Sequence, residues 1–113
     1  ADIIWMARFR GQPIPAWDLD YEPHHRLDDL KARRSALDRD ILGYVMELEA
    51  GRMEAEITYH TIVGPREVRQ PLGQALAHFF NHHTHHRGQC HAMLTRLTGS
   101  APPLDLLFYQ RRT

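Results

Sequence analysis

Residues 71–99 of this 113-residue chain read PLGQALAHFFNHHTHHRGQCHAMLTRLTG. Their apolar side chains recur at steps of three and four residues, which predicts a long amphipathic helix. Pro71 suits the first turn of such a helix, and Gly99 suits the position just past its end. On a helical wheel, an apolar face about 120° wide contains Leu72, Ala75, Leu76, Phe79, His82, His83, His86, Cys90, Met93, Leu94 and Leu97.

Six of the nine histidines of the chain lie within this helix, between residues 78 and 91. They do not form one cluster, because only His82, His83 and His86 lie on the apolar face. His82 and His86 are one turn apart, with Cβ atoms separated by about 5–6 Å. Two imidazole nitrogens at that spacing can reach one ion at about 2.0–2.1 Å. We therefore predict that His82 and His86 are ligands of a divalent metal ion.

Other arrangements of these residues are weaker. His83 with His86, and His78 with His82, have suitable spacing, but His83 and His78 lie off the centre of the face. A single inward histidine is more often a core residue with one hydrogen-bond partner than a ligand. Two ligands hold a metal poorly, and the candidates for a third are typical surface residues: His24, His25 and His60. Cys90 lies on the same face, where we interpret it as a small buried core residue rather than a nucleophile.

The remainder of the chain suggests three further helical segments and a hairpin. Residues 1–10 have an apolar face and stop at Gly11 and the following prolines. Residues 24–50 predict a long amphipathic helix ending at Gly51, in which Arg34 interrupts the apolar stripe and should reach the edge of the helix packing. Residues 54–70 alternate apolar and polar side chains around Gly64 and Pro65, which predicts a hairpin. LDLLFYQ, residues 104–110, fits one or two helical turns.

Composition excludes several classes of protein. Lys plus Arg and Asp plus Glu number 14 each, so the chain lacks the basic excess that nucleic acids or anionic membranes require, and we expect neither as a partner. It has no apolar run of about 18 residues that would cross a membrane and no signal peptide pattern. The single cysteine cannot form an internal disulfide, which favours the reducing cytoplasm.

Three segments resemble the DinB/YfiT family of metalloenzymes: IWMARFRG at residues 4–11, NHHTHHRGQ at 81–89 and PLDLLFYQR at 103–111. The resemblance covers essentially the whole chain, and H-x-x-x-H-R-G-Q is its most specific part. It implies one all-α domain over residues 1–113, a four-helix bundle with a divalent metal held by three histidines. Two of these match His82 and His86. The third falls upstream of Asp2, before Ala1, so we expect a chain that lacks the first helix of the bundle.

The resemblance also implies a function. Related members look like transferases or isomerases that use low-molecular-weight thiols such as bacillithiol, mycothiol or glutathione. We expect a zinc or nickel ion, although iron, copper or manganese is also compatible with the ligands. A thiol activated by the ion would attack an electrophilic substrate. The alternative is a non-catalytic, metal-binding stress-response protein, and in either case we expect a homodimer. Arg87 and Gln89 either orient the ligands or are simply solvated.

Overall fold

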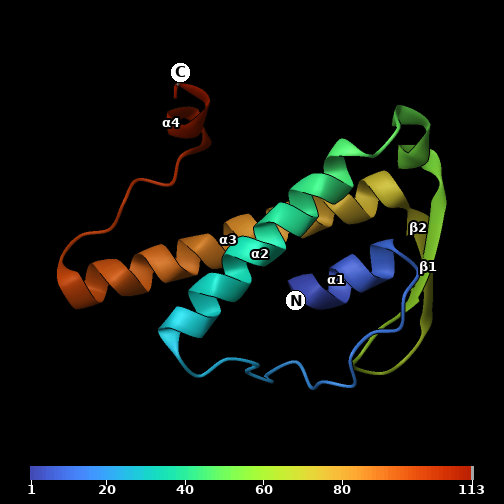
Figure 1. Ribbon diagram of the computed structural model, residues 1–113, viewed down its shortest axis with the longest axis horizontal. Helices are drawn as coiled ribbons and strands as arrows, with labels where there is room; N and C mark the ends of the chain where they lie inside the picture. The colour runs from blue at the N-terminus through green and yellow to red at the C-terminus, as the bar shows by residue number, and fades with distance from the viewer. Residues whose placement is uncertain (113) are drawn as a thin grey trace. The chain divides into compact units, whose positions relative to one another are not determined.

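The computed structural model describes residues 1–112 and contains seven elements (Figure 1). In chain order they are α1 (Asp2–Phe9), α2 (Leu27–Met46), the 3-10 helix η1 (Ala50–Glu54), β1 (Glu56–His60), β2 (Glu67–Pro71), α3 (Leu72–Thr98) and α4 (Leu106–Gln110). The chain divides into two compact units, Ala1–Leu76 and Ala77–Thr113. The first unit contains everything up to the first turn of α3, and the second contains the remainder of α3 and α4.

In the first unit, the short helix α1 lies between α2 and the hairpin (Figure 1). Its aromatic side chains contact both neighbours. The Trp5 ring meets the ring of Tyr59 on β1 edge to face, with centroids 5.2 Å apart, and the Phe9 ring stacks on Tyr44 of α2 at 5.8 Å. Such aromatic pairs stabilise a core beyond the area that they bury. The buried apolar side chains of this unit are Ile4, Trp5, Met6, Phe9, Leu37, Ile41, Leu72, Ala75 and Leu76.

Two ion pairs that involve arginine link the polar side of α1 to α2. The Arg10 guanidinium donates two hydrogen bonds of 2.8 Å to the carboxylate of Asp40 on α2. Arg34 of α2 donates to Asp2 and also pairs with Asp38 at 2.6 Å. The Arg34 side chain is 42% exposed, so it does reach the edge of the packing as expected, where two carboxylates hold it.

The predicted hairpin is confirmed. β1 and β2 pair antiparallel, with Ile57 opposite Gln70 and Tyr59 opposite Val68. These four side chains are half-buried and alternate with exposed ones, as expected for a strand pair with one covered face. The connecting loop closes through Thr61, whose hydroxyl donates to the Gly64 carbonyl at 2.9 Å and accepts from the Arg66 amide at 3.0 Å.

Helix α3 follows β2 without a loop. The Leu72 amide donates to the Ala55 carbonyl at 2.8 Å, which ties the start of the helix to the residue after η1. A Cβ atom at Gly73 would lie 3.1 Å from the Met53 carbonyl oxygen, so this close approach favours glycine. The helix ends at Thr98, and Gly99 has a φ of 81°, a left-handed conformation typical of the position after a helix. Both predicted ends of this helix are therefore correct to within one residue.

The predicted fold class is wrong. The described residues form a mixed structure of helices with a two-stranded antiparallel sheet, and not an all-α four-helix bundle. Only α2 and α3 are long, since α1 has 8 residues and α4 has 5. The hairpin covers part of the apolar face of α1, a face that only other helices would cover in a helical bundle. Helix α2 is also shorter than predicted, ending at Met46, and Gly51 lies in η1.

The Arg10–Asp40 pair gives a stability prediction. Replacing Arg10 with Gln should lower the free energy of unfolding at pH 6 by about 0.5–1 kcal/mol, the upper part of the range for exposed ion pairs, because both hydrogen bonds are lost. The hydrogen bonds from Arg10 hold the pKa of Asp40 below its ordinary value of 3.8. The stabilisation is therefore complete above that pH and is lost as the pH falls through the lowered pKa.

Urea unfolding of the wild type and of Arg10→Gln at pH 6 and near pH 2 measures this difference. Arg39→Gln is the matched control, since Arg39 is an exposed arginine of α2 outside the ion pairs that link described residues. An Arg10→Gln deficit that is equal at both pH values would contradict the account.

Candidate functional site

The apolar face of α3 changes character along the helix. Phe79 is 1% exposed, and His82 and His83, which follow it on the same face, are half-buried. The Phe79 and His83 rings meet at 4.3 Å in a T-shaped arrangement. From His86 onward this face is exposed, and Met93 and Leu97 are 57% and 83% exposed. His82 and His86 therefore lie at the point where the buried part of this face of α3 ends and its exposed part begins.

The side chains of His82 and His86 converge. Their Nε2 atoms lie 2.9 Å apart, and the ring planes are nearly perpendicular at 85°. An ion about 2.0–2.1 Å from each nitrogen would subtend an angle of about 90°, and a tetrahedral ion would need the two nitrogens to separate by a few tenths of an ångström. The two imidazoles therefore fit two positions around one first-row divalent ion.

Two further histidine rings lie close to His82. Its ring centroid lies 5.5 Å from that of His78 and 6.4 Å from that of His85. Burial, and then the proximity of His86, His78 and His85, lower the pKa of His82 below its ordinary value of 6.5. Only an unprotonated ring nitrogen binds a metal, and the surroundings of His82 favour the neutral ring, which has one such nitrogen.

The described part of the chain places no third protein ligand beside the pair. Within residues 1–112, no group of three or more His, Cys, Asp and Glu side chains is placed to hold one ion. The earlier candidates lie in the first unit: His60 is on β1, and His24 and His25 are in the loop before α2, where His25 is 3.8 Å from Glu22. The assignment of His82 and His86 as ligands thus stays a prediction based on their geometry.

Gln89 contacts the pair, whereas Arg87 does not. The Gln89 carboxamide oxygen lies 2.8 Å from Nδ1 of His86, the ring nitrogen on the far side from His82. Arg87 instead donates to the Thr84 hydroxyl at 3.4 Å. Sequence reasoning left the roles of both residues open. The structure separates them, since only Gln89 bonds to a predicted ligand.

Cys90 is exposed, so its interpretation as a buried core residue is wrong. Helical periodicity correctly places Cys90 on the same face as Phe79 and His86, but no described residue covers this part of the face. The spacing of residues within a helix predicts on which face a side chain lies, whereas its burial depends on whether another element packs against that face.

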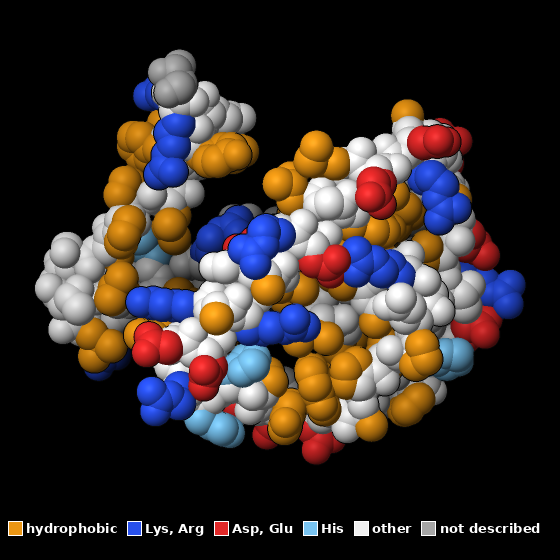
Figure 2. Space-filling model, viewed as in Figure 1, with side chains coloured by type: hydrophobic (Ala, Val, Ile, Leu, Met, Phe, Trp, Pro, Cys, Tyr) orange, Lys and Arg blue, Asp and Glu red, His pale blue; other side chains and the backbone are white. Residues whose placement is uncertain are grey.

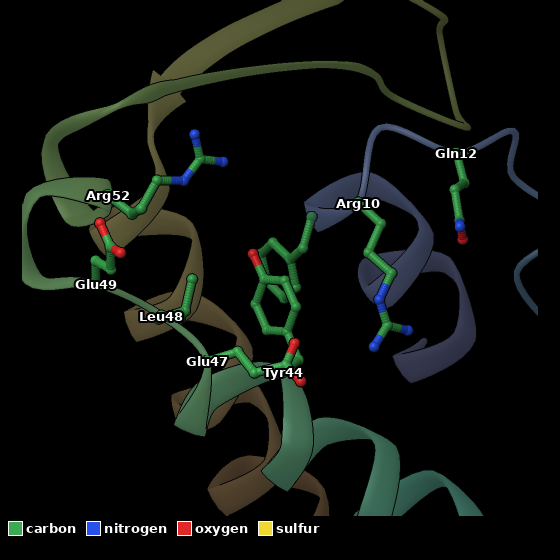
Figure 3. A pocket seen from close by; sticks show the side chains of 8 residues that line it. Arg10, Gln12, Tyr44, Glu47, Leu48, Glu49 and Arg52 are labelled. Carbon is green, nitrogen blue, oxygen red and sulfur yellow. The ribbon is translucent and has the colours of Figure 1, made fainter.

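A pocket of about 490 Å³ in the first unit was not anticipated from the sequence (Figure 3). Tyr44 projects into it from α2, with Arg10 on one side and Arg52 on the other. The Tyr44 hydroxyl is buried and has no hydrogen-bond partner among residues 1–112, and burial raises its pKa. Arg10 is neutralised by Asp40, while Glu47 and Glu49 offset Arg52, so the pocket favours no ligand of one charge. Its residues come from the end of α1, the end of α2, the segments that follow these two helices, and η1, and no local motif predicts them.

Comparison with known proteins gives one match. The model of the family described as "DinB family" matches residues 1–113. The chain has no significant match among curated proteins or among solved structures. Among the helices of the described chain, none combines the length and the apolar character needed to cross a membrane.

The exposure of Cys90 gives a direct prediction. A disulfide reagent such as dithionitrobenzoate should react with about one thiol per native chain, at a rate close to that of the unfolded chain, because an exposed thiol needs no opening of the structure. The absorbance of the released thiolate, with and without urea, measures both rates. The Cys90→Ala chain is the blank. Reaction only after addition of urea would show that Cys90 is covered in solution.

Proposed function

The chain belongs to the DinB family, and from that premise we propose that it is a divalent-metal-dependent enzyme with His82 and His86 as ligands. One observation carries the proposal: two ring nitrogens on neighbouring turns of α3 face each other at 2.9 Å. In the absence of an ion the two nitrogens contact each other directly, and a bound ion would take the place of that contact. A shared ion gives both nitrogens a strong partner and compensates for the partial burial of His82.

Zinc or nickel is the ion that we propose, with iron, copper or manganese as further possibilities that an imidazole pair accepts. When bound, such an ion lowers the pKa of a thiol or water molecule and polarises an electrophile. The family resemblance favours a low-molecular-weight thiol as the nucleophile and a transfer or isomerisation as the reaction. A small thiol and an electrophile would both need access to the site, and the exposure of His86 supports such access.

Each residue around the proposed ion has a separate role in this proposal. His82 and His86 hold the ion, and Gln89 contacts His86 from the opposite side of the ring. Phe79 and His83 fill the side of α3 next to His82 and limit the approach of water there. The other positions around the ion are left for substrate, solvent or a partner chain.

A second candidate is a non-catalytic, metal-binding homodimer of the stress-response type. It is favoured by apolar side chains exposed in the second unit, which Figure 2 shows over the C-terminal segment. Leu97 is 83% exposed, and the others on α3, in α4 and between them are Phe80, Met93, Leu94, Leu104, Leu106, Leu107, Phe108 and Tyr109. Monomeric proteins rarely leave large contiguous apolar patches uncovered. A monomeric mass by light scattering at micromolar concentration would count against a dimer.

Metal binding is the primary test. In equilibrium dialysis against Zn²⁺ or Ni²⁺, the wild type should retain about one ion per chain, and His82→Ala and His86→Ala should each lose most of it, because a single imidazole holds such an ion weakly. Mass spectrometry of the metal measures the content. His91→Ala is the matched control, since His91 lies on the opposite side of α3. Equal metal content in all four proteins would overturn the proposed ligands.

Turnover separates the two candidate functions. The metal-loaded wild type should accelerate consumption of a small thiol by an electrophile such as chlorodinitrobenzene, which forms a thioether and releases chloride, and His86→Ala should not. Metal that raises the melting temperature without any turnover across a panel of thiols would instead support the non-catalytic protein.

A further inference from the structure

Three polar groups form a continuous chain of contacts along α3. The Gln89 Oε1 atom lies 2.8 Å from His86 Nδ1, and His86 Nε2 lies 2.9 Å from His82 Nε2. The three residues are spaced by three and four positions, so each contact links adjacent turns of one face. Each contact needs one donor and one acceptor, and the chemistry of Gln89 determines which is which.

A carboxamide oxygen can only accept a hydrogen bond. The hydrogen in the first contact must therefore be on Nδ1 of His86. A neutral imidazole carries one N–H, so Nε2 of His86 is left with its lone pair, directed at His82. That is the arrangement in which a histidine binds a metal through Nε2, with the other ring nitrogen donating to a neighbouring oxygen.

His82 is in the opposite state. Since Nε2 of His86 is an acceptor, Nε2 of His82 must be the donor in the second contact. A nitrogen that carries hydrogen has no free lone pair for an ion. His82 can therefore bind through Nε2 only after its hydrogen has moved from Nε2 to Nδ1, by exchange with water, which leaves the ring neutral.

We infer that Gln89 is a positioning residue that presents Nε2 of His86 as a ready metal ligand, while His82 becomes a ligand only by exchanging its N–H to the other ring nitrogen. This rests on the proposed function, because it concerns the same two ligands. It assigns unequal roles to residues that look equivalent in the sequence. It also gives the glutamine of the H-R-G-Q segment a role that its arginine does not share, since Arg87 is bonded to Thr84.

The exposed position of Gln89 and His86 limits the size of the effect, because water competes for the same hydrogen bond. Oxygen partners of metal-binding histidines typically change affinity by about 10- to 100-fold, and the lower figure is expected here. Glutamate offers an acceptor oxygen in nearly the same place, and leucine offers none. The two substitutions therefore separate hydrogen bonding from side-chain size.

The test is long-range ¹H–¹⁵N NMR of the histidine rings in the metal-free full chain, combined with Zn²⁺ titration. The wild type should show His86 with hydrogen on Nδ1 and His82 with hydrogen on Nε2. Gln89→Glu should keep the His86 pattern, and Gln89→Leu should shift His86 toward the Nε2–H form and raise the Zn²⁺ dissociation constant about tenfold. Gln74→Leu, an exposed position earlier in α3, is the matched control and should leave both readouts unchanged. Circular dichroism verifies that each variant keeps its helix content.

The outcomes separate this inference from the proposed function. His86 with hydrogen on Nε2 in the wild type, or Gln89→Leu with unchanged ring signals and unchanged affinity, would overturn the inference. A wild type that shows the expected ring pattern, loses it in Gln89→Leu and yet binds no Zn²⁺ or Ni²⁺ would support the orienting role of Gln89 and overturn the metal-dependent function.

Discussion

The repeat of the α-helix is the constraint on which the candidate site depends. α3 runs without interruption for 27 residues, from Leu72 to Thr98, so a residue near its start determines which way every later residue faces. Burial of Leu72 and Ala75 in the first unit aligns one face of the helix. The same face, continued for two more turns, carries His82 and His86. The start of the helix thus determines which face the two histidines occupy, while the spacing of four residues and the side-chain rotamers bring their Nε2 atoms together.

The first unit has its own source of stability, which does not involve the histidines. The 8-residue helix α1 is too short to be stable alone, and its apolar face is held by aromatic contacts to α2 and β1. Arg10 and Asp2 add ion pairs to Asp40 and Arg34 of α2. Arg8 donates a hydrogen bond of 3.0 Å to the backbone carbonyl of His60. Loss of metal or of its ligands should therefore leave this unit folded.

Part of the fold and of the candidate site could be predicted from the sequence, because these features depend on residues that are close together in the chain. Spacing placed His82 and His86 on one face, alternation and Gly64 predicted the hairpin, and Gly99 marked the end of α3. The wrong predictions concern which elements pack against each other. An apolar stripe does not say whether a helix or a hairpin covers it, so the all-α bundle was wrong, and Cys90 was assigned to a core that does not reach it. The contact from Gln89 to His86 depends on side-chain rotamers, which no spacing rule provides.

The central claim is that one ion is bound by both His82 and His86. X-ray absorption at the metal edge of the Ni²⁺-loaded protein tests it most directly, because imidazole rings produce a distinctive outer-shell scattering pattern. We expect at least two imidazole ligands at about 2.0–2.1 Å in the wild type and one fewer in His82→Ala and in His86→Ala. A spectrum with no imidazole scattering, or one that neither substitution alters, would contradict it.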